Sequence, residues 1–200
     1  ELYVVTLSAL LSGSHNSAQQ ARQIWLEEHP DAKVHIFNSC SASAGEALLA
    51  MKIREFASQG LLFQQVIREV DRFSRDMQTL FVLESLDNLR KNGRLTGLQS
   101  VVTGALRIKL LMGATPEGEI CKKGQAISIK QALSKMVELM VKDAKHVGRT
   151  LVLSHCNCLE RAFQLKEMVL KACQFRDVVI VETRGISTVY ANDGGIVAAY

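Results

Sequence analysis

Small polar side chains cluster where a short apolar segment gives way to a helical pattern, in Leu7-Ser8-Ala9-Leu10-Leu11-Ser12-Gly13-Ser14-His15-Asn16-Ser17-Ala18. The first turn of a helix exposes unpaired N–H groups and the positive end of the helix dipole, and serine hydroxyls add further donors. Together these groups favour an anion such as a carboxylate or a phosphate. The same residue types also form ordinary N-terminal caps, so this segment alone leaves both interpretations open.

A serine hydrolase is the sharper alternative, because Ser14 and His15 are adjacent. However, the G-x-S-x-G pattern is absent from the sequence, and adjacent residues on a helix do not face each other. His155 could also supply a base, but the sequence indicates no acidic partner for it. These observations argue against hydrolase chemistry.

His155-Cys156-Asn157-Cys158 raises the question of a metal site. Structural zinc sites generally combine C-x₂₋₄-C pairs with a second pair of ligands elsewhere. Here the spacing is C-x-C, and the remaining cysteines, Cys40, Cys121 and Cys173, form no companion pattern. The sequence therefore predicts no metal site, and we expect these cysteines to act as small core residues.

Leu89-Arg90-Lys91-Asn92-Gly93-Arg94-Leu95 ends a predicted short helix with a glycine and then an arginine. Arg94 is either a cation at a helix end or the holder of an anion. From Asn88 to Pro116 there is no acidic residue, and the basic ones are Arg90, Lys91, Arg94, Arg107 and Lys109. Such a stretch favours an anionic ligand, an acidic partner or an anionic lipid surface, with a solvated helix face as the plain alternative.

The elements that must position these residues alternate at the start of the chain. Short apolar segments predict strands at residues 2–7 and 34–37, and helical spacing predicts helices at residues 14–28 and 43–58. A third helix carries Val66, Ile67, Val70 and Phe73. This alternation predicts a parallel sheet with helical crossovers.

The second part of the chain has a different pattern. Thr115-Pro116-Glu117-Gly118 is a turn signal between two apolar segments and predicts a β-hairpin inside a helix-rich region, hence a mixed α+β unit. We place a domain boundary near Met77–Gln78, giving a Rossmann-like α/β remainder at residues 1–78 and an α+β domain at 79–200. Strands are predicted at residues 79–84, 108–114, 119–123, 150–154, 178–183 and 195–200, and helices at 85–91, 98–106, around 129–144 and at 159–173.

Composition sets outer limits on function. Of 200 residues, 48% are hydrophobic and 22% charged, and no apolar run is long enough to span a membrane. The net charge of +4 is too small to argue for nucleic acid by itself. Five cysteines without a disulfide framework lead us to expect a reducing, cytoplasmic setting. Because the chain starts with Glu1 inside a predicted strand, we expect that an N-terminal segment is missing.

Several segments in order resemble the bacterial DegV family of fatty-acid-binding proteins. The first two are Leu11-Ser12-Gly13-Ser14 with Asn16-Ser17-Ala18, and Asn38-Ser39-Cys40-Ser41-Ala42-Ser43-Ala44-Gly45. The longest runs from Phe81 through Leu95, and shorter ones are Arg107-Ile108-Lys109 and Leu153-Ser154-His155. The resemblance extends over essentially the whole chain.

This resemblance implies a protein of two domains: a truncated Rossmann-like parallel-sheet domain, followed by a mixed α+β domain with a hairpin. It also implies that a long-chain fatty acid binds between the two domains. Ser8 then matches a serine that bonds the carboxylate, Ser12 and Gly13 match the following loop, and Arg94 matches an arginine of the head-group network. Many family members carry a histidine before a Gly-Pro-Gly turn near the C-terminus. Here the histidine's role is either vacant or taken by Tyr190 or Asn192.

The implied function is that of a carrier rather than a catalyst. An ATP-dependent fatty acid kinase subunit would phosphorylate the bound fatty acid, Arg90, Lys91 and Arg107 would face that partner, and no cofactor besides the lipid is implied. Transient contact with a membrane surface is compatible with this function. The alternative is a small-molecule enzyme related to dihydroxyacetone kinase, which would need a histidine in its pocket.

Overall fold

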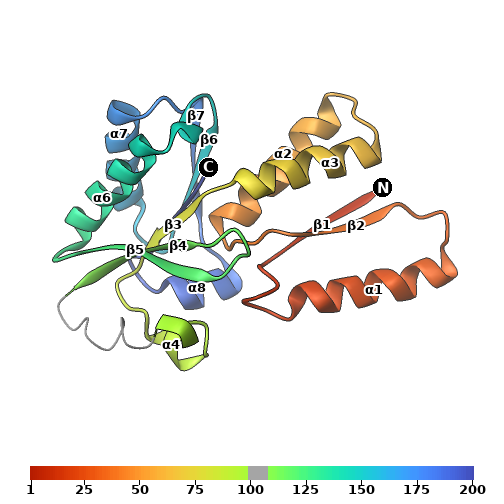
Figure 1. Cartoon of the computed structure of the whole chain (residues 1–200), viewed down its shortest axis with the longest axis horizontal. Coiled ribbons are helices and arrows are strands. Elements are labelled where there is room, and N and C mark those ends of the chain that lie inside the picture. The colour runs from red at the N-terminus through yellow and green to blue at the C-terminus, as the bar shows by residue number, and fades with distance from the viewer. Residues whose placement is uncertain (99–107) are drawn as a thin grey trace.

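The first lobe of the protein is built on two parallel strands. The computed structural model describes residues 1–98 and 108–200. Strand β1 (Leu2–Thr6) pairs with β2 (Val34–Asn38), and Leu2 lies opposite Val34. Helix α1 (Ser14–Glu28) covers one face of this pair, and α2 (Ala44–Ser58) with α3 (Phe63–Asp76) covers the other (Figure 1).

The second lobe is built on a six-stranded mixed sheet in the order β5-β4-β3-β8-β6-β7. Only β6 and β7 are parallel, and they are joined through a helix, as parallel neighbours require. All other neighbours are antiparallel. The strands are β3 (Thr79–Val82), β4 (Lys109–Ala114), β5 (Ile120–Ala126), β6 (Thr150–His155), β7 (Asp177–Glu182) and β8 (Ile196–Ala199).

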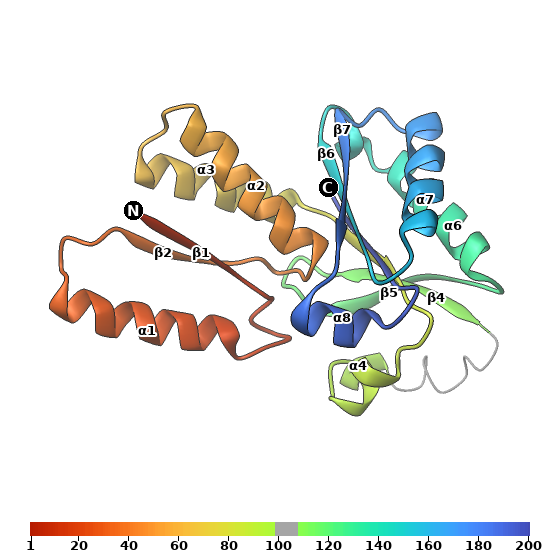
Figure 2. The same ribbon diagram turned by 180° about the vertical axis from the view of Figure 1, so that it is seen from behind.

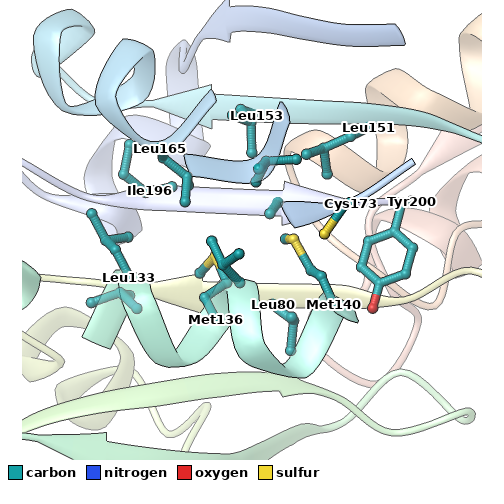
Figure 3. Close-up of a cluster of buried hydrophobic side chains, with 14 of the residues drawn as sticks. Leu80, Leu133, Met136, Met140, Leu151, Leu153, Leu165, Cys173, Ile196 and Tyr200 are labelled. Atoms are coloured by element: carbon teal, nitrogen blue, oxygen red, sulfur yellow. The ribbon is translucent and has the colours of Figure 1, made fainter. Parts of the chain in front are cut away.

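The main core lies between one face of this sheet and two long helices, α6 (Ile129–Lys142) and α7 (Leu159–Ala172). Met136 and Met140, one turn apart on α6, pack there with Leu153 of β6 and Leu165 of α7 (Figure 3). Tyr200 closes one end of the core, and its hydroxyl donates to the Asp143 carboxylate over 3.2 Å. The apolar face of α6 is thus packed against the sheet.

The opposite face of the sheet carries α2, α4 (Asp87–Lys91) and α8 (Gly185–Ala191) (Figure 2). Their buried residues Leu48, Leu89 and Ala191 pack with Phe81 and other residues of the sheet. This second core is the one that surrounds the candidate site.

Helix α2 belongs to both lobes. Leu49 packs in the first-lobe core, whereas its neighbour Leu48 packs against the six-stranded sheet. The division of the strands into two sheets falls between β2 and β3. The domain boundary near Met77–Gln78 stays a prediction, since α2 connects the two units.

The mixed α/β architecture predicted from the sequence is confirmed, including the hairpin. Strands β4 and β5 are antiparallel, and the turn between them is closed by a hydrogen bond from the Thr115 N–H to the Glu119 carbonyl, 2.8 Å long. Most of the helix predicted at residues 98–106 lies outside the described residues. The short 3₁₀ turn η1 (Thr96–Leu98) precedes that gap.

Three predictions about the elements were wrong. No helix was predicted near residue 186, but α8 is present. Ile186, Thr188 and Val189 are poor helix formers, so the helix depends on the packing of Ala191. The strand predicted to reach Glu84 ends at Val82. The long helix ends at Lys142, because the Asp143 carboxylate caps the following 3₁₀ turn η2 (Ala144–His146).

Within residues 1–98 and 108–200, every helix is too short or too polar to cross a bilayer.

Candidate functional site

Ser8 lies immediately beyond β1, and its side chain is completely buried. Its hydroxyl donates to the Gly118 carbonyl over 2.8 Å, and its N–H donates to the Ser41 carbonyl over 2.9 Å. Gly118 has a φ of +94°, and a Cβ there would overlap the Ser8 Oγ. The tip of the β4–β5 hairpin is therefore fitted against the serine loop of the first lobe.

A second serine-rich loop, residues 39–43, follows β2 and leads into α2. The Ser41 Oγ lies 2.7 Å from the Thr79 Oγ1, and the Ser43 Oγ lies 2.7 Å from the Ser154 Oγ. Each pair joins a first-lobe residue to a strand of the six-stranded sheet. Ser43 also caps α2 together with Glu46, and its φ of +53° is unusual for a residue other than glycine.

A narrow cavity of about 100 Å³ lies between these loops, the second face of the sheet and α8. Its walls are mainly apolar: Phe81 and Val197 contribute from the sheet, and Leu83 contributes from just beyond β3. The residues lining it are Leu7, Leu11, Ser41, Ala42, Ser43, Thr79, Phe81, Leu83, Leu89, Arg94, Gly113, Ala114, Gly118, Glu119, Ile120, Ile186, Ser187, Tyr190, Ala191 and Val197. We call this space the slot.

Arg94 stands at the opening of this slot. Helix α4 ends at Lys91, and Gly93, with a φ of +73°, turns the chain so that Arg94 points toward the first lobe. The Arg94 Nε donates to the Leu11 carbonyl over 3.1 Å, and the guanidinium lies 5.8 Å from the centre of the Tyr190 ring. A positive charge is thus fixed at the mouth of an otherwise apolar space.

The mouth continues into a wider hollow of about 600 Å³. Ser12 and Gly13 line this hollow on one side, and residues 92–98 line it on the other. Leu11, Arg94, Glu119 and Ile120 line both spaces. The hollow gives the slot an open vestibule at the Arg94 end, and its lining also includes one acidic residue, Glu119.

The predicted head-group residues occupy different places in this arrangement. Arg94 lines the slot and the vestibule, and Ser12 and Gly13 line the vestibule. Ser8 lies behind the wall and is bound to Gly118 rather than facing the space. The structure therefore gathers three of the four at the vestibule and places Ser8 just beneath it.

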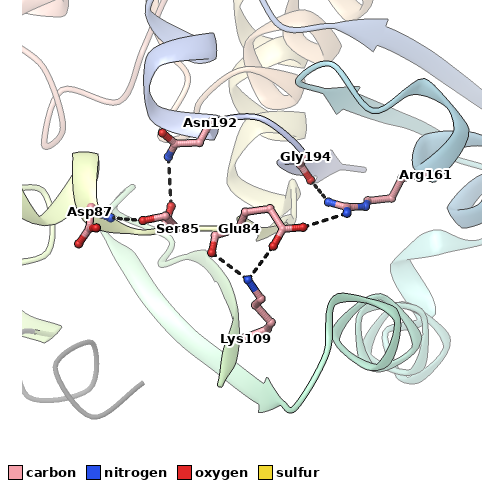
Figure 4. A network of polar contacts seen from close by, with 7 residues as sticks. All are labelled: Glu84, Ser85, Asp87, Lys109, Arg161, Asn192 and Gly194. Atoms are coloured by element: carbon pink, nitrogen blue, oxygen red, sulfur yellow. Dashed lines mark hydrogen bonds and ion pairs between the residues drawn. The ribbon is translucent and has the colours of Figure 1, made fainter. Parts of the chain in front are cut away.

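Of the two residues predicted to replace the family histidine, one lines the slot and the other does not. Tyr190 lines the slot beside Arg94. Asn192 instead connects two loops: its amide donates to the Ser85 carbonyl over 3.1 Å (Figure 4), and its side-chain oxygen accepts from the Asn88 amide over 2.9 Å. Of the two predicted replacements for the family histidine, only Tyr190 faces the slot.

The basic stretch is less free than its sequence indicates. Lys109 binds the Glu84 carboxylate over 2.6 Å, and Arg161 binds its other oxygen over 2.9 Å (Figure 4). Burial raises the pKa of Glu84, but the hydrogen bonds from Lys109 and Arg161 and their charges outweigh it, so the pKa is lowered. Lys109 is thereby paired within the protein, and it shares the Glu84 carboxylate with Arg161.

Two other members of the stretch remain at the surface. Arg90 is exposed and makes only a long contact with Asp87, 3.3 Å, while Lys91 is exposed on the same helix. Arg107 lies outside the described residues. That Arg90, Lys91 and Arg107 form a partner surface stays a prediction.

The histidines do not form a catalytic set around the slot. His15 bonds to the Thr6 hydroxyl over 3.0 Å, and the His155 ring accepts from the Cys158 N–H over 3.3 Å. Among the described residues that line the slot, none is a histidine. In the described part of the chain no group of three or more His, Cys, Asp or Glu residues could hold a metal.

Sequence reasoning missed several residues of the slot. Ser41 lies in a segment that was singled out only for its resemblance, and Thr79 was assigned only to a strand. The repeated serines at residues 39, 41 and 43 were the available signal. Their pairing with Thr79 and Ser154 depends on how the two lobes meet, which the sequence does not display.

Comparison with known proteins gives a consistent assignment. The sequence model described as "Uncharacterised protein, DegV family" matches residues 1–200. A DegV domain-containing protein of Streptococcus gordonii is 35% identical over 199 residues, which is 100% of this chain and 70% of the relative.

Solved structures agree. A DegV family protein of Ruminococcus gnavus, refined with vaccenic acid, has a TM-score of 0.94 at 46% identity, over 99% of this chain and 71% of that one. The fatty acid kinase (Fak) B3 protein of Streptococcus pneumoniae, loaded with linoleic acid, has a TM-score of 0.91 at 35% identity, over 99% and 70%. A DegV family protein of Eubacterium eligens, loaded with heptadecanoic acid, has a TM-score of 0.90 at 28% identity, over 98% and 71%.

Proposed function

Because this chain belongs to the DegV family, we propose that it binds a long-chain fatty acid and presents the carboxylate to an ATP-dependent fatty acid kinase subunit. The observation that carries the proposal is the narrow apolar slot with Arg94 fixed at its open end. Similar proteins hold vaccenic, linoleic and heptadecanoic acid. The acyl chain lies in the slot, and its carboxylate faces the vestibule.

The energetics of such a ligand suit the site. Burying an acyl chain is favourable by about 0.8 kcal/mol per CH₂ group, so the slot supplies most of the affinity. The carboxylate cannot enter an apolar space without a large desolvation cost. Arg94 and the wide vestibule keep it at the surface, where a second protein can reach it.

The protein acts as a carrier in this proposal, and the kinase performs the phosphoryl transfer. The slot offers no histidine for covalent attachment among its described residues, and the fatty acid is the only small molecule required. Support for the kinase comes from the resemblance to the fatty acid kinase B3 protein. The five free cysteines support a reducing, cytoplasmic compartment.

Denaturing mass spectrometry of the purified full-length protein tests the ligand. We expect stoichiometric co-purified fatty acid, and incubation with a fatty acid kinase and ATP should convert it to the acyl phosphate. A protein that carries no lipid and does not take up added fatty acid would exclude the proposal. If the protein takes up fatty acid but no fatty acid kinase phosphorylates it, the proposed lipid site stands and the proposed kinase partner is excluded.

A further inference from the structure

A pair of buried hydroxyl groups lies in the wall of the slot. Ser41 is 2% exposed and Thr79 is 7% exposed, and both line the cavity. Their oxygens are 2.7 Å apart, which is a hydrogen bond in which either residue can be the donor. Ser41 comes from the first lobe and Thr79 from the start of β3.

Only one of the two hydroxyl hydrogens of this pair takes part in the hydrogen bond between them. Each hydroxyl carries a single hydrogen, and the bond between Ser41 and Thr79 uses only one of the two. Within the described residues, neither oxygen has a second hydrogen-bond partner. A buried donor without an acceptor is costly, so such groups are normally satisfied. The free hydrogen has space to point into the slot, since both residues line it.

The surrounding residues keep the pair in place. The Ser41 carbonyl accepts from the Ser8 N–H, and the Ser41 N–H donates to the Ser39 hydroxyl over 3.1 Å. Gly45 faces the Ser41 side chain so closely that a Cβ there would overlap the Ser41 Oγ. The packing therefore holds the Ser41 side chain in place before any ligand arrives, while either hydroxyl of the pair can act as the donor.

The pair also lies at a defined end of the slot. Thr79 and Phe81 line it from β3 and Leu83 lines it from just beyond the strand, so roughly 13 Å of extended chain separates the polar residue from the last apolar one. On the neighbouring strand Gly113, which lies opposite Leu80, lines the slot together with Ala114, and Ala114 lies opposite Ile120, which also lines the vestibule. The unused hydrogen is thus at the vestibule end, and the apolar wall extends away from it.

We infer that Ser41 and Thr79 together form a carboxylate-binding element of this protein, in which one hydroxyl donates to the other and the second donates to the fatty acid. The inference rests on the proposed function and adds two residues to its site. It also sets the ligand's direction: the carboxylate lies near Thr79 and the chain runs past Phe81 toward Leu83. A carboxylate is the acceptor that fits best, because hydrogen bonds to a charged oxygen are the stronger ones.

The two hydroxyls should behave unlike independent contacts when they are removed. In Ser41→Ala the Thr79 hydrogen is released and can turn to the carboxylate, and in Thr79→Val the Ser41 hydrogen can do the same. Each single variant should then lose little affinity for stearic acid. The double variant has no donor left, and its affinity should fall about 10- to 100-fold.

Binding of stearic acid and octadecanol to the full-length protein, measured by calorimetry, tests this arrangement. The alcohol buries the same chain but offers a neutral oxygen, so its affinity should fall far less in the double variant. Thr183→Val is the matched control, because it breaks a hydroxyl pair with Thr188, 3.1 Å long, and neither of these two residues lines the slot. It should leave both affinities near the wild-type values, and thermal unfolding of all variants shows that they are folded.

Two results would overturn the inference. One is a double variant that binds stearic acid as tightly as the wild type. The other is an equal loss for acid and alcohol, which would mean that the pair only joins the lobes. A wild-type protein that binds neither ligand would remove the proposed function, and the inference with it.

Discussion

Ser8 and Gly118, 110 residues apart in the chain, are joined by a buried hydrogen bond in which the serine hydroxyl donates to the glycine carbonyl over 2.8 Å. A serine hydroxyl has one hydrogen, so Ser8 cannot donate to Gly118 and to a carboxylate at the same time. If Ser8 contacts the head group as the family resemblance implies, this bond to the hairpin must first be exchanged. The hairpin tip and the head group therefore compete for one hydrogen.

Ser8→Ala should lower the free energy of unfolding of the ligand-free protein by about 1–3 kcal/mol, because the buried Gly118 carbonyl loses its donor. Urea denaturation measures this change. The loss of fatty-acid affinity should be smaller than for a serine that donates only to the ligand. An unchanged stability combined with a large loss of affinity would show that Ser8 serves the ligand alone.

Gly118→Ala should be more destabilising than an ordinary glycine substitution. The residue has a φ of +94°, and the new Cβ would overlap the Ser8 side chain and the Cys40 backbone. Gly60→Ala is the matched control: its φ is +81°, but nothing lies within 4 Å of the added Cβ. We expect Gly60→Ala to cost about 1 kcal/mol and Gly118→Ala clearly more. Equal costs in thermal unfolding would contradict the close fit of the hairpin.

Glu84 should make the protein sensitive to acid. Its pKa in the folded protein lies below the ordinary value of 4.5, so its ion pairs stabilise the fold above that pH. This contribution is lost as the pH falls through the depressed pKa, because the carboxylate is then protonated beside Lys109 and Arg161. Glu84→Gln should lower stability at pH 7 and make its decline below pH 4.5 shallower. Parallel curves of unfolding free energy against pH would refute this role.

Reversing the charge of Arg90 and Lys91 to Glu should slow phosphorylation of bound fatty acid and leave lipid binding intact. Charges that steer a partner act through the solvent, so the wild-type rate should also fall as salt rises. Lys130→Glu with Lys171→Glu is the control, because it changes the net charge equally on α6 and α7, across the sheet from α4. A similar slowing in the control would point to net charge alone. Loss of lipid binding would place Arg90 and Lys91 in the slot or the fold.

Local sequence patterns predicted most helices and strands. The elements that were missed depend on tertiary contacts, which a local pattern does not contain. The period of Leu133, Met136 and Met140 identified α6, and the turn residues at 115–118 identified the hairpin. Helix α8 was not predicted, because its β-branched residues favour strands and its helical structure depends on packing.

The same distinction between local patterns and tertiary contacts applies to the candidate site. A local signal, a glycine cap at a helix end, drew attention to Arg94, and its role at the head group stays a prediction that rests on the resemblance. The Ser41–Thr79 pair and the Ser8–Gly118 bond join segments 38 and 110 residues apart, and no local signal specifies them. The Asn192 side chain bonds to the Ser85 carbonyl from a turn with a φ of +56°, and its proposed role at the head group stays a prediction.

Helix α2 packs against both sheets through adjacent residues, with Leu48 buried on one side and Leu49 on the other. Neither lobe can lose its structure without exposing one of these faces, so α2 couples the folding of the two lobes. The chain should therefore unfold in one cooperative transition, with the amide hydrogens of α2 exchanging as slowly as those of the central strands. A ligand held between the lobes would then protect the whole molecule, rather than one half, from proteolysis.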